Sequence, residues 1–374
     1  MTQSDANALR RFDPQAPLTG VLHIEVACDW GDEVDLNHAA RLMPSEQQSL
    51  SRRPRTPSSI AYRPAPLRFR QPPLTVQIAE LGPCQAEVDV TVFDFAAVNI
   101  GLQIPFTLTP PALLRLARCL AEPESLVLQA RRAAEPLYRH LLPAIKSPRW
   151  SDVSEEYFVF QLQPSCLPLP EQLVQQAPEW LAGLLRLEDL PLSTEEVSDA
   201  LRQRMSYTNE DLVLIEWSAA VVIDRDCDEI LQTMEFANLQ LLEFRHIDQR
   251  VDDVLKAAYG LIHPLAGSWL PFWKMQTKPL RTLGDLRIEA DVLFERASNA
   301  LKLVGDQYVA RLYRMLAKRF HLDEWAEGIH SSLDVAVGVY QVLSDQASAY
   351  RIEVLEIIVI VLIALEIVLA LFEH

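Results

Sequence analysis

The side chains of this protein that could carry chemistry are histidines, cysteines and aspartates, and their spacing fits no familiar catalytic or metal-binding pattern. The closest two of its eight histidines, His321 and His330, lie nine residues apart, whereas two ligands on one helical face need a spacing of three or four. The five cysteines form no CxxC pair, and the sequence has no phosphate-binding glycine loop and no HExxH or GxSxG motif. We therefore expect no catalytic, cofactor-binding or metal-binding residues, and a protein that is not an enzyme.

Three aspartates at alternating positions, Asp224, Asp226 and Asp228, have the spacing of the first ligands of a calcium-binding loop. They lack the glycine and the terminal glutamate that such a loop requires. Aspartate is also a preferred residue at the start of a helix, where its carboxylate accepts a hydrogen bond from a free backbone N–H. We expect these side chains to cap a helix that begins near Asp228.

The charge and composition of the protein exclude several classes. With 51 acidic against 34 basic residues the formal charge is -17, which argues against direct binding to nucleic-acid phosphates. The chain is 49% hydrophobic, so it can bury a core, and its length fits two domains with accessory segments. Widely spaced cysteines and the lack of a secretory signal favour the cytoplasm.

The last part of the sequence predicts a membrane anchor. Residues Ile357 to Phe372 are apolar except for Glu366, and Ile352, Val354 and Leu355 extend the run upstream. As a helix, about 21 residues rise about 31 Å, close to the thickness of a bilayer core. We expect one transmembrane helix in the bacterial inner (cytoplasmic) membrane, with the bulk of the protein facing the cytoplasm.

The acidic residues of this tail need partners. A carboxyl at the depth of Glu366 should be protonated or should share a hydrogen bond with another helix, which makes it our candidate for a helix–helix contact inside the membrane. Arg351, Glu353 and Glu356 are candidates for the membrane interface. The alternative is that the run is a buried or coiled-coil helix of a soluble bundle.

A long helical region precedes the tail. Residues Ile230, Met234, Ala237, Leu241 and Phe244 begin a heptad pattern that continues to Ile262. A second helix is expected from Leu286 to Met315 and a third from Asp323 into the tail, either as a straight rod or with a kink near Gly338. Between the first two helices, Trp269 and Trp273 are close to lysines in the sequence. We expect these tryptophans either to contact lipid headgroups or to pack on the end of the bundle.

The middle of the chain predicts a separate α/β module. Strands are expected at 88–92, 157–162, 212–217 and 220–223, and helices at 110–121, 125–142, 171–187 and 193–205. Upstream, residues 51–73 are rich in arginine and proline and predict a linker. This linker is either a solubilising tether or a segment whose arginines contact anionic lipid or RNA. Residues Val21 to Ala27 predict one strand in the N-terminal segment.

The expected fold class is therefore α+β: an α/β sandwich with a small sheet, then a long antiparallel, coiled-coil-like helical bundle and one C-terminal transmembrane helix. The expected ranges are an N-terminal segment at 1–50, the linker at 51–73, the α/β head at 74–227, the bundle at 228–350 and the anchor at 351–374.

Four runs of the sequence resemble the required-for-meiotic-nuclear-division family, which is a family of unknown function. They are SYTNEDLVLIEWSAAVVID, EFANLQLLEFRHID, NALKLVGDQYVARLY and LEIIVIVLIALEIVLALF. In the last run, Glu356 and Glu366 bracket the apolar residues as the paired acids of the family do, although Ile357 stands where a tryptophan often follows. The resemblance, from about Phe93 to the end, implies a divergent bacterial relative of a mitochondrial membrane protein that supports translation. It supplies no catalytic residues.

Two functional classes follow. The first is a non-enzymatic, membrane-anchored scaffold that forms homo-oligomers through its helical bundle and recruits an unknown cytoplasmic protein, with a ribosome-associated partner as one candidate. The second is a membrane-tethered enzyme with its site in the α/β head, around Tyr157, Glu216 and Trp217. No cofactor is expected in either case.

Overall fold

A computed structural model describes residues 11–43, 47–48, 64–78, 80–262, 287–288, 291 and 307–372. The chain divides into two units. The first comprises Met1–Glu243 and Arg296–Asp323, and the second comprises Phe244–Glu295 and Glu324–His374. Helices α8 (Asp228–Ile262) and α11 (Leu322–Phe372) contribute residues to both.

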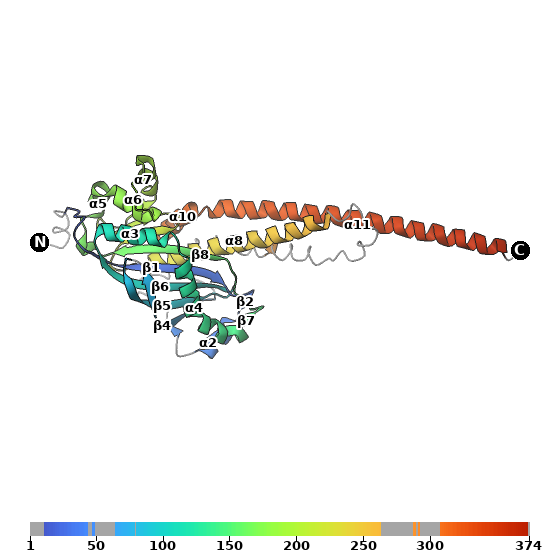
Figure 1. The fold of residues 1–374 in the computed structure, drawn as a ribbon, viewed down its shortest axis with the longest axis horizontal. Coiled ribbons are helices and arrows are strands. Elements are labelled where there is room, and N and C mark those ends of the chain that lie inside the picture. Colours follow the sequence, from blue (N-terminus) through green and yellow to red (C-terminus); the bar gives the residue numbers. More distant parts are fainter. Residues whose placement is uncertain are drawn as a thin grey trace. The chain divides into compact units, whose positions relative to one another are not determined.

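The first unit is built on a nine-stranded sheet with the strand order β3-β4-β5-β6-β1-β8-β11-β10-β9. Figure 1 labels β1, β6, β5 and β4 next to one another in this order. All neighbours are antiparallel except β8 and β11, which pair in parallel. The strands are β1 (Leu18–Asp29), β3 (Gln47–Gln48), β4 (Leu67–Ile78), β5 (Gly82–Val92), β6 (Ala97–Leu108), β8 (Ser154–Leu162), β9 (Arg204–Met205), β10 (Leu212–Ile215) and β11 (Ala219–Ile223). A separate small ladder joins β2 (Glu33–Val34) to β7 (Ile145–Lys146). The prediction of a mixed α and β protein is confirmed, but the sheet is large and not small.

Strand β1 lies in the middle of this sheet. The predicted strand at Val21 to Ala27 is confirmed, and it extends to Leu18 and Asp29. Its side chains alternate between the two faces of the sheet, so that Leu22, Ile24 and Val26 enter the main apolar core. The N-terminal segment is therefore part of the sheet.

Strand β4 begins inside the predicted linker. Residues 51–63 lie outside the described part of the chain, but Leu67 to Pro73 form the first half of β4 and are not a linker. The pairing of β4 with β5 shifts its register between Gln71 and Leu74, where Pro72 and Pro73 stand. A bulge at this point accommodates two residues that have no N–H to donate, which is why the proline-rich sequence still forms a strand.

Helices cover the apolar face of the sheet through the main core. The buried residues of α3 (Pro110–Leu120) and α4 (Glu124–Leu141) belong to this core, as the helical patterns at 110–121 and 125–142 predicted. Figure 1 shows α4 lying across the strands. The remaining short elements are α2 (Leu36–Leu42), η1 (Leu142–Ala144), η2 (Pro164–Cys166), α5 (Pro170–Gln176), α6 (Pro178–Arg186) and α7 (Thr194–Ala200).

Two of the predicted helices are shorter than expected. The pattern at 171–187 divides into α5 and α6 because Pro178 cannot continue the first helix. The pattern that starts after Ser193 ends at Ala200, and β9 follows. The predicted cap is confirmed, since the Ser193 hydroxyl accepts from the Glu196 N–H at 3.2 Å.

Helix α8 begins at Asp228 as predicted, but its first half belongs to the core of the sheet unit. Leu239 and Leu242 pack with Ala27, Phe93 and Ala97 from the sheet. On another side of the helix, the Tyr313 hydroxyl of α10 (Gln307–Arg319) donates to Gln240 Oε1, and the rings of Phe236 and Tyr313 lie 5.5 Å apart. From Thr233 to Phe244 the helix is buried on nearly all sides. A heptad pattern with one helical partner would bury only one stripe of the helix, so α8 has more than one partner here.

The second unit contains antiparallel helical segments. Two ion pairs join the segment at 287–291 to α11: Arg287 with Asp334 at 3.0 Å, and Asp291 with His330 at 3.9 Å. Because the later residue of one segment pairs with the earlier residue of the other, the two run in opposite directions. Helix α11 is continuous through Gly338, so the helix does not end there.

No helix in the described part of the chain has the length and apolar character that crossing a bilayer requires. The predicted transmembrane helix therefore receives no support here and stays a prediction.

The close approach of β1 and β8 makes Gly20 a sensitive position. A Cβ added at Gly20 would lie 2.2 Å from the backbone oxygen of Gln161. We expect Gly20→Ala to lower the free energy of unfolding by about 1–3 kcal/mol, measured by urea denaturation. Gly328→Ala on α11 is the control, because a Cβ there meets nothing within 4 Å; an equal midpoint for both variants would contradict the register of β1.

Candidate functional site

The face of the sheet opposite the main core carries a row of polar side chains. Pairing places Arg70 of β4 opposite Asp89 of β5, Asp89 opposite Gly101 of β6, and Gly101 opposite Glu25 of β1. The neighbouring row runs through Arg68, Thr91 and Asn99 in the same way. We call these residues, with Glu235 of α8, the polar layer.

Glu25 lies at the centre of the polar layer. Its Oε2 accepts a hydrogen bond of 2.6 Å from Asn99 Nδ2. A Cβ added at Gly101 would lie 3.1 Å from the same oxygen, so the glycine leaves the space that the carboxyl occupies. The local cause is sequence alternation, because the apolar positions of β1 face the main core and Glu25 therefore faces away from it.

Arginines from β4 neutralise part of the layer. Arg68 Nη2 lies 3.1 Å from Glu235 Oε2, and Arg68 Nε donates to the Thr91 hydroxyl at 3.2 Å. Arg70 Nε lies 2.7 Å from Asp89 Oδ1. Glu25, Asp89 and Glu235 thus share two guanidinium groups.

Burial dominates the electrostatics of the polar layer. Desolvation, then the nearby Glu235 carboxylate, raises the pKa of Glu25 to about 7. Burial also raises the pKa of Asp89. Burial opposes the charge of Arg68, but Glu235 and Glu25 outweigh it and raise the pKa of Arg68. Glu25, Asp89 and Glu235 are all buried, whereas the Arg70 side chain at the edge of the layer is 41% exposed.

A second polar contact continues along β1. His23 Nε2 lies 3.0 Å from Gln161 Oε1, and Gln161 Nε2 donates to the Asp224 carbonyl at 3.2 Å. Burial lowers the pKa of His23. These contacts connect the sheet to the loop that leads into α8.

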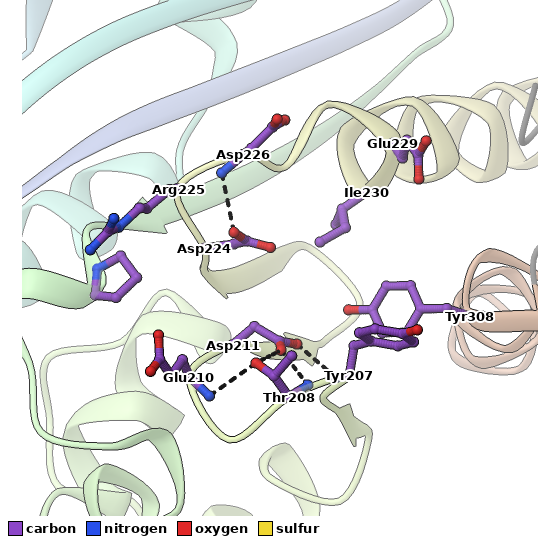
Figure 2. Close-up of a pocket in the computed structure, with 11 residues that line it drawn as sticks. Tyr207, Thr208, Glu210, Asp211, Asp224, Arg225, Asp226, Glu229, Ile230 and Tyr308 are labelled. Carbon is purple, nitrogen blue, oxygen red and sulfur yellow. Dashed lines mark hydrogen bonds between the residues drawn. The ribbon is translucent and has the colours of Figure 1, made fainter. Parts of the chain in front are cut away.

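That loop forms one wall of a cavity of about 470 Å³. Figure 2 shows the loop with Asp224 and Asp226 on one side of the cavity and the turn with Glu210 and Asp211 on the other. Its other lining residues are Pro164, Tyr207, Thr208, Arg225, Glu229, Ile230 and Tyr308.

The aspartates of the cavity have structural tasks. Asp211 accepts from the Tyr207 N–H at 2.8 Å, and Asp224 accepts from the Asp226 N–H at 3.1 Å. The Asp224 bond closes a turn in the loop before α8 and does not reach the N–H groups of the helix, so the capping of α8 by these aspartates stays a prediction. Within the described residues, no group of three histidine, cysteine or acidic side chains is placed to hold a metal ion.

Tyr157 and Glu216, which we considered with Trp217 as the surroundings of an enzyme site, are buried in a structural cluster. Trp217 is 38% exposed, and its ring lies 6.1 Å from that of Phe320. The buried Tyr157 hydroxyl donates to the backbone oxygens of Glu216 at 3.1 Å and of Ala219 at 3.2 Å. The Glu216 carboxylate is 2% exposed and pairs with Arg186 at 2.8 Å and with Arg319. The Glu216 carboxylate is thus held between two guanidinium groups.

Most of the predicted membrane and contact residues fall where side chains are not described. Trp269 and Trp273 lie outside the described residues, and Arg351, Glu353 and Glu366 are described only as backbone in α11. Glu356 is exposed. The structure brings none of these predicted residues together in a described contact.

The sequence reasoning missed the polar layer. The signal available was that His23 and Glu25 interrupt an apolar strand at alternating positions, as Asp89 and Thr91 do in β5. What it could not supply was the register that places these residues, with Glu235, on one face.

The Glu216 cluster generates a stability prediction. Arg319 also donates to Asp199 at 3.2 Å, and that hydrogen bond lowers the pKa of Asp199. We expect Arg319→Met to lower the free energy of unfolding by about 2–3 kcal/mol, because it leaves the buried Glu216 with one cation. Arg202→Met, at a side chain that is 69% exposed, is the control and should change it by less than about 1 kcal/mol. Equal effects in urea denaturation would show that the cluster is not structural.

Comparison with known proteins assigns the sheet unit to a family. The family described as "Uncharacterized protein MJ0711, N-terminal domain" matches residues 19–229, which run from β1 to the start of α8. The uncharacterized protein MJ0711 of Methanocaldococcus jannaschii is 26% identical over 204 residues, which is 54% of this chain and 62% of the relative. The match thus spans less than two thirds of the relative's length, and no solved structure matches.

These matches support a domain family without an assigned function, and they leave the resemblance to the required-for-meiotic-nuclear-division family unconfirmed. The matched segment contains Glu25, Arg68, Asp89 and Asn99 of the polar layer, while Glu235 follows it. Because the match covers more than half of the sequence, this chain belongs to the MJ0711 N-terminal domain family.

Proposed function

We propose that this protein is a non-enzymatic scaffold, held at the inner membrane by the end of α11, whose sheet unit binds a cytoplasmic protein. The observation that carries the proposal is a group of apolar side chains on α11. Val359, Ile360, Leu362 and Ile363 are between 50% and 64% exposed. Soluble monomers seldom leave a group of large apolar side chains in water, which favours a cover by lipid or by another helix.

The angular spread of these side chains favours lipid as the cover. Successive residues of a helix are about 100° apart, so the four side chains cover about 160° of the helix surface. A two-stranded coiled coil needs only the narrower stripe of its a and d positions. A bilayer covers a helix on all sides, and the carboxyl of Glu366 would then lie at a contact between two copies.

Self-association has separate support upstream in α11. Val335 and Val342 are 52% and 58% exposed and lie seven residues apart, the spacing of equivalent positions in a coiled coil. Two copies that join there would bring their tails together at the membrane. A ribosome-associated partner is one candidate for the sheet unit, by the resemblance to the required-for-meiotic-nuclear-division family.

A membrane-tethered enzyme is the second candidate function. The observation in its favour is the acidic cavity of Figure 2, which is large enough for a small molecule. Against it, Asp211 and Asp224 accept backbone hydrogen bonds within their own turns. We therefore favour the scaffold.

Membrane attachment is tested by fractionation after a carbonate wash. We expect the full chain in the pellet and a chain without residues 351–374 in the supernatant. Ile360→Glu combined with Ile363→Glu should also release the protein, because each buried charge opposes insertion by roughly 2.5–3.5 kcal/mol. The matched control, Ile360→Leu with Ile363→Leu, should stay in the pellet. A full chain in the supernatant, or a truncated chain in the pellet, rejects the anchor.

A further inference from the structure

We infer that one proton held between Glu25 and Glu235 controls how tightly helix α8 is attached to the sheet. With the proton bound, the first half of α8 is held against the sheet, and without it this contact loosens. The inference rests on the geometry of the polar layer and is independent of the proposed function.

The charges that face Glu25 do not balance. On β4 and β5, Arg70 lies against both Asp89 and Glu87. Among the described residues of the polar layer, Arg68 is then the cation left for two carboxylates, Glu25 and Glu235. Burying a second negative charge without a cation to pair with has a large free-energy cost. A pair of buried carboxylates that shares one cation therefore keeps one proton.

The remaining groups around Glu25 do not supply the missing positive charge. On β8 the residue opposite Glu25 is Tyr157, whose hydroxyl donates to backbone oxygens elsewhere. His23 on β1 is bound to Gln161, and its pKa is lowered by burial. Among the described residues, further acids lie on this face or on α8: Asp29 on β1, Glu155 on β8, and Asp228 and Glu243 on α8. None of them adds a positive charge.

Two buried acceptor atoms of the polar layer also need a hydrogen-bond donor. Asn99 Oδ1 and Glu235 Oε1 are buried acceptors to which no donor is assigned. Asn99 already uses its Nδ2 to donate to Glu25. A carboxyl O–H on Glu25 or Glu235 is the donor that this set of acceptors lacks.

The sign of the effect follows from the pKa of Glu25. Burial and Glu235 raise that pKa from 4.5 to about 7 in the folded protein. The folded form therefore binds the proton more tightly than a form in which α8 has left the sheet. Stability from this group is complete below pH 4.5 and is lost as the pH rises to about 7.

Loosening has a defined structural consequence. Leu239 and Leu242 of α8 cover Ala27, Phe93 and Ala97 on the sheet. When α8 leaves, this apolar patch and the charged layer beside it meet water. Alkaline conditions should therefore expose a surface that is closed at acidic pH.

Hydrogen exchange of the full chain tests the inference. Protection factors of peptides within Asp228–Glu243, corrected for the intrinsic exchange rate, should fall about tenfold between pH 6 and pH 8, while those of β1 change less. Glu25→Gln fixes the neutral form, so its protection should be equal at both pH values. The control, Glu87→Gln, alters an exposed acid and should keep the wild-type response.

Two results would overturn the inference: equal protection of the wild type at both pH values, or a pH response that persists in Glu25→Gln. If Glu25→Gln does not fold, Glu235→Gln replaces it. Burial still raises the pKa of Glu25 in this variant, but the Glu235 charge is gone, so the fall in melting temperature between pH 6 and pH 8 should be clearly smaller than in the wild type. A melting temperature of Glu235→Gln that still falls over this range as in the wild type would also reject the proton-sharing pair.

Discussion

The pairing of β1 with β6 on one side and with β8 on the other is the interaction on which the sheet unit depends. Without β1, the strands from β3 to β6 and those from β8 to β9 would form two separate sheets. The same strand also divides the interior, since its apolar side chains enter the main core and its polar side chains form the far face. One stretch of 12 residues thus sets both the continuity of the sheet and the position of the polar layer.

The elements that the sequence predicted well are those whose causes are local. Helices α3 and α4 follow from an amphipathic pattern, and α7 begins where Ser193 caps it. Strand β4 was missed because its arginines and prolines look like a linker, and only the partner strand β5 shows that the prolines fall in a bulge. The size of the sheet was underestimated because β6 was also not among the predicted strands.

The polar layer could not be predicted because it is assembled by register. Arg68, Asp89, Asn99 and Glu25 come from four strands, and a shift of one residue in any pairing would turn a side chain to the other face. Helix α8 shows a related limit. Its heptad pattern identified the helix, but Leu239 and Leu242, outside that pattern, pack on the sheet and show that the helix has more than one partner.

The place of β1 in the sheet has a consequence for synthesis on the ribosome. The strand ends at Asp29, but its partner β8 is not complete before Leu162. At a synthesis rate of about 5–20 residues per second, β1 therefore has no β8 strand to pair with for roughly 7–27 s. During that time an unpaired strand can join another nascent chain. His23 and Glu25 interrupt its apolar sequence and oppose such pairing, so the residues that are buried in the finished sheet protect the strand before the sheet exists.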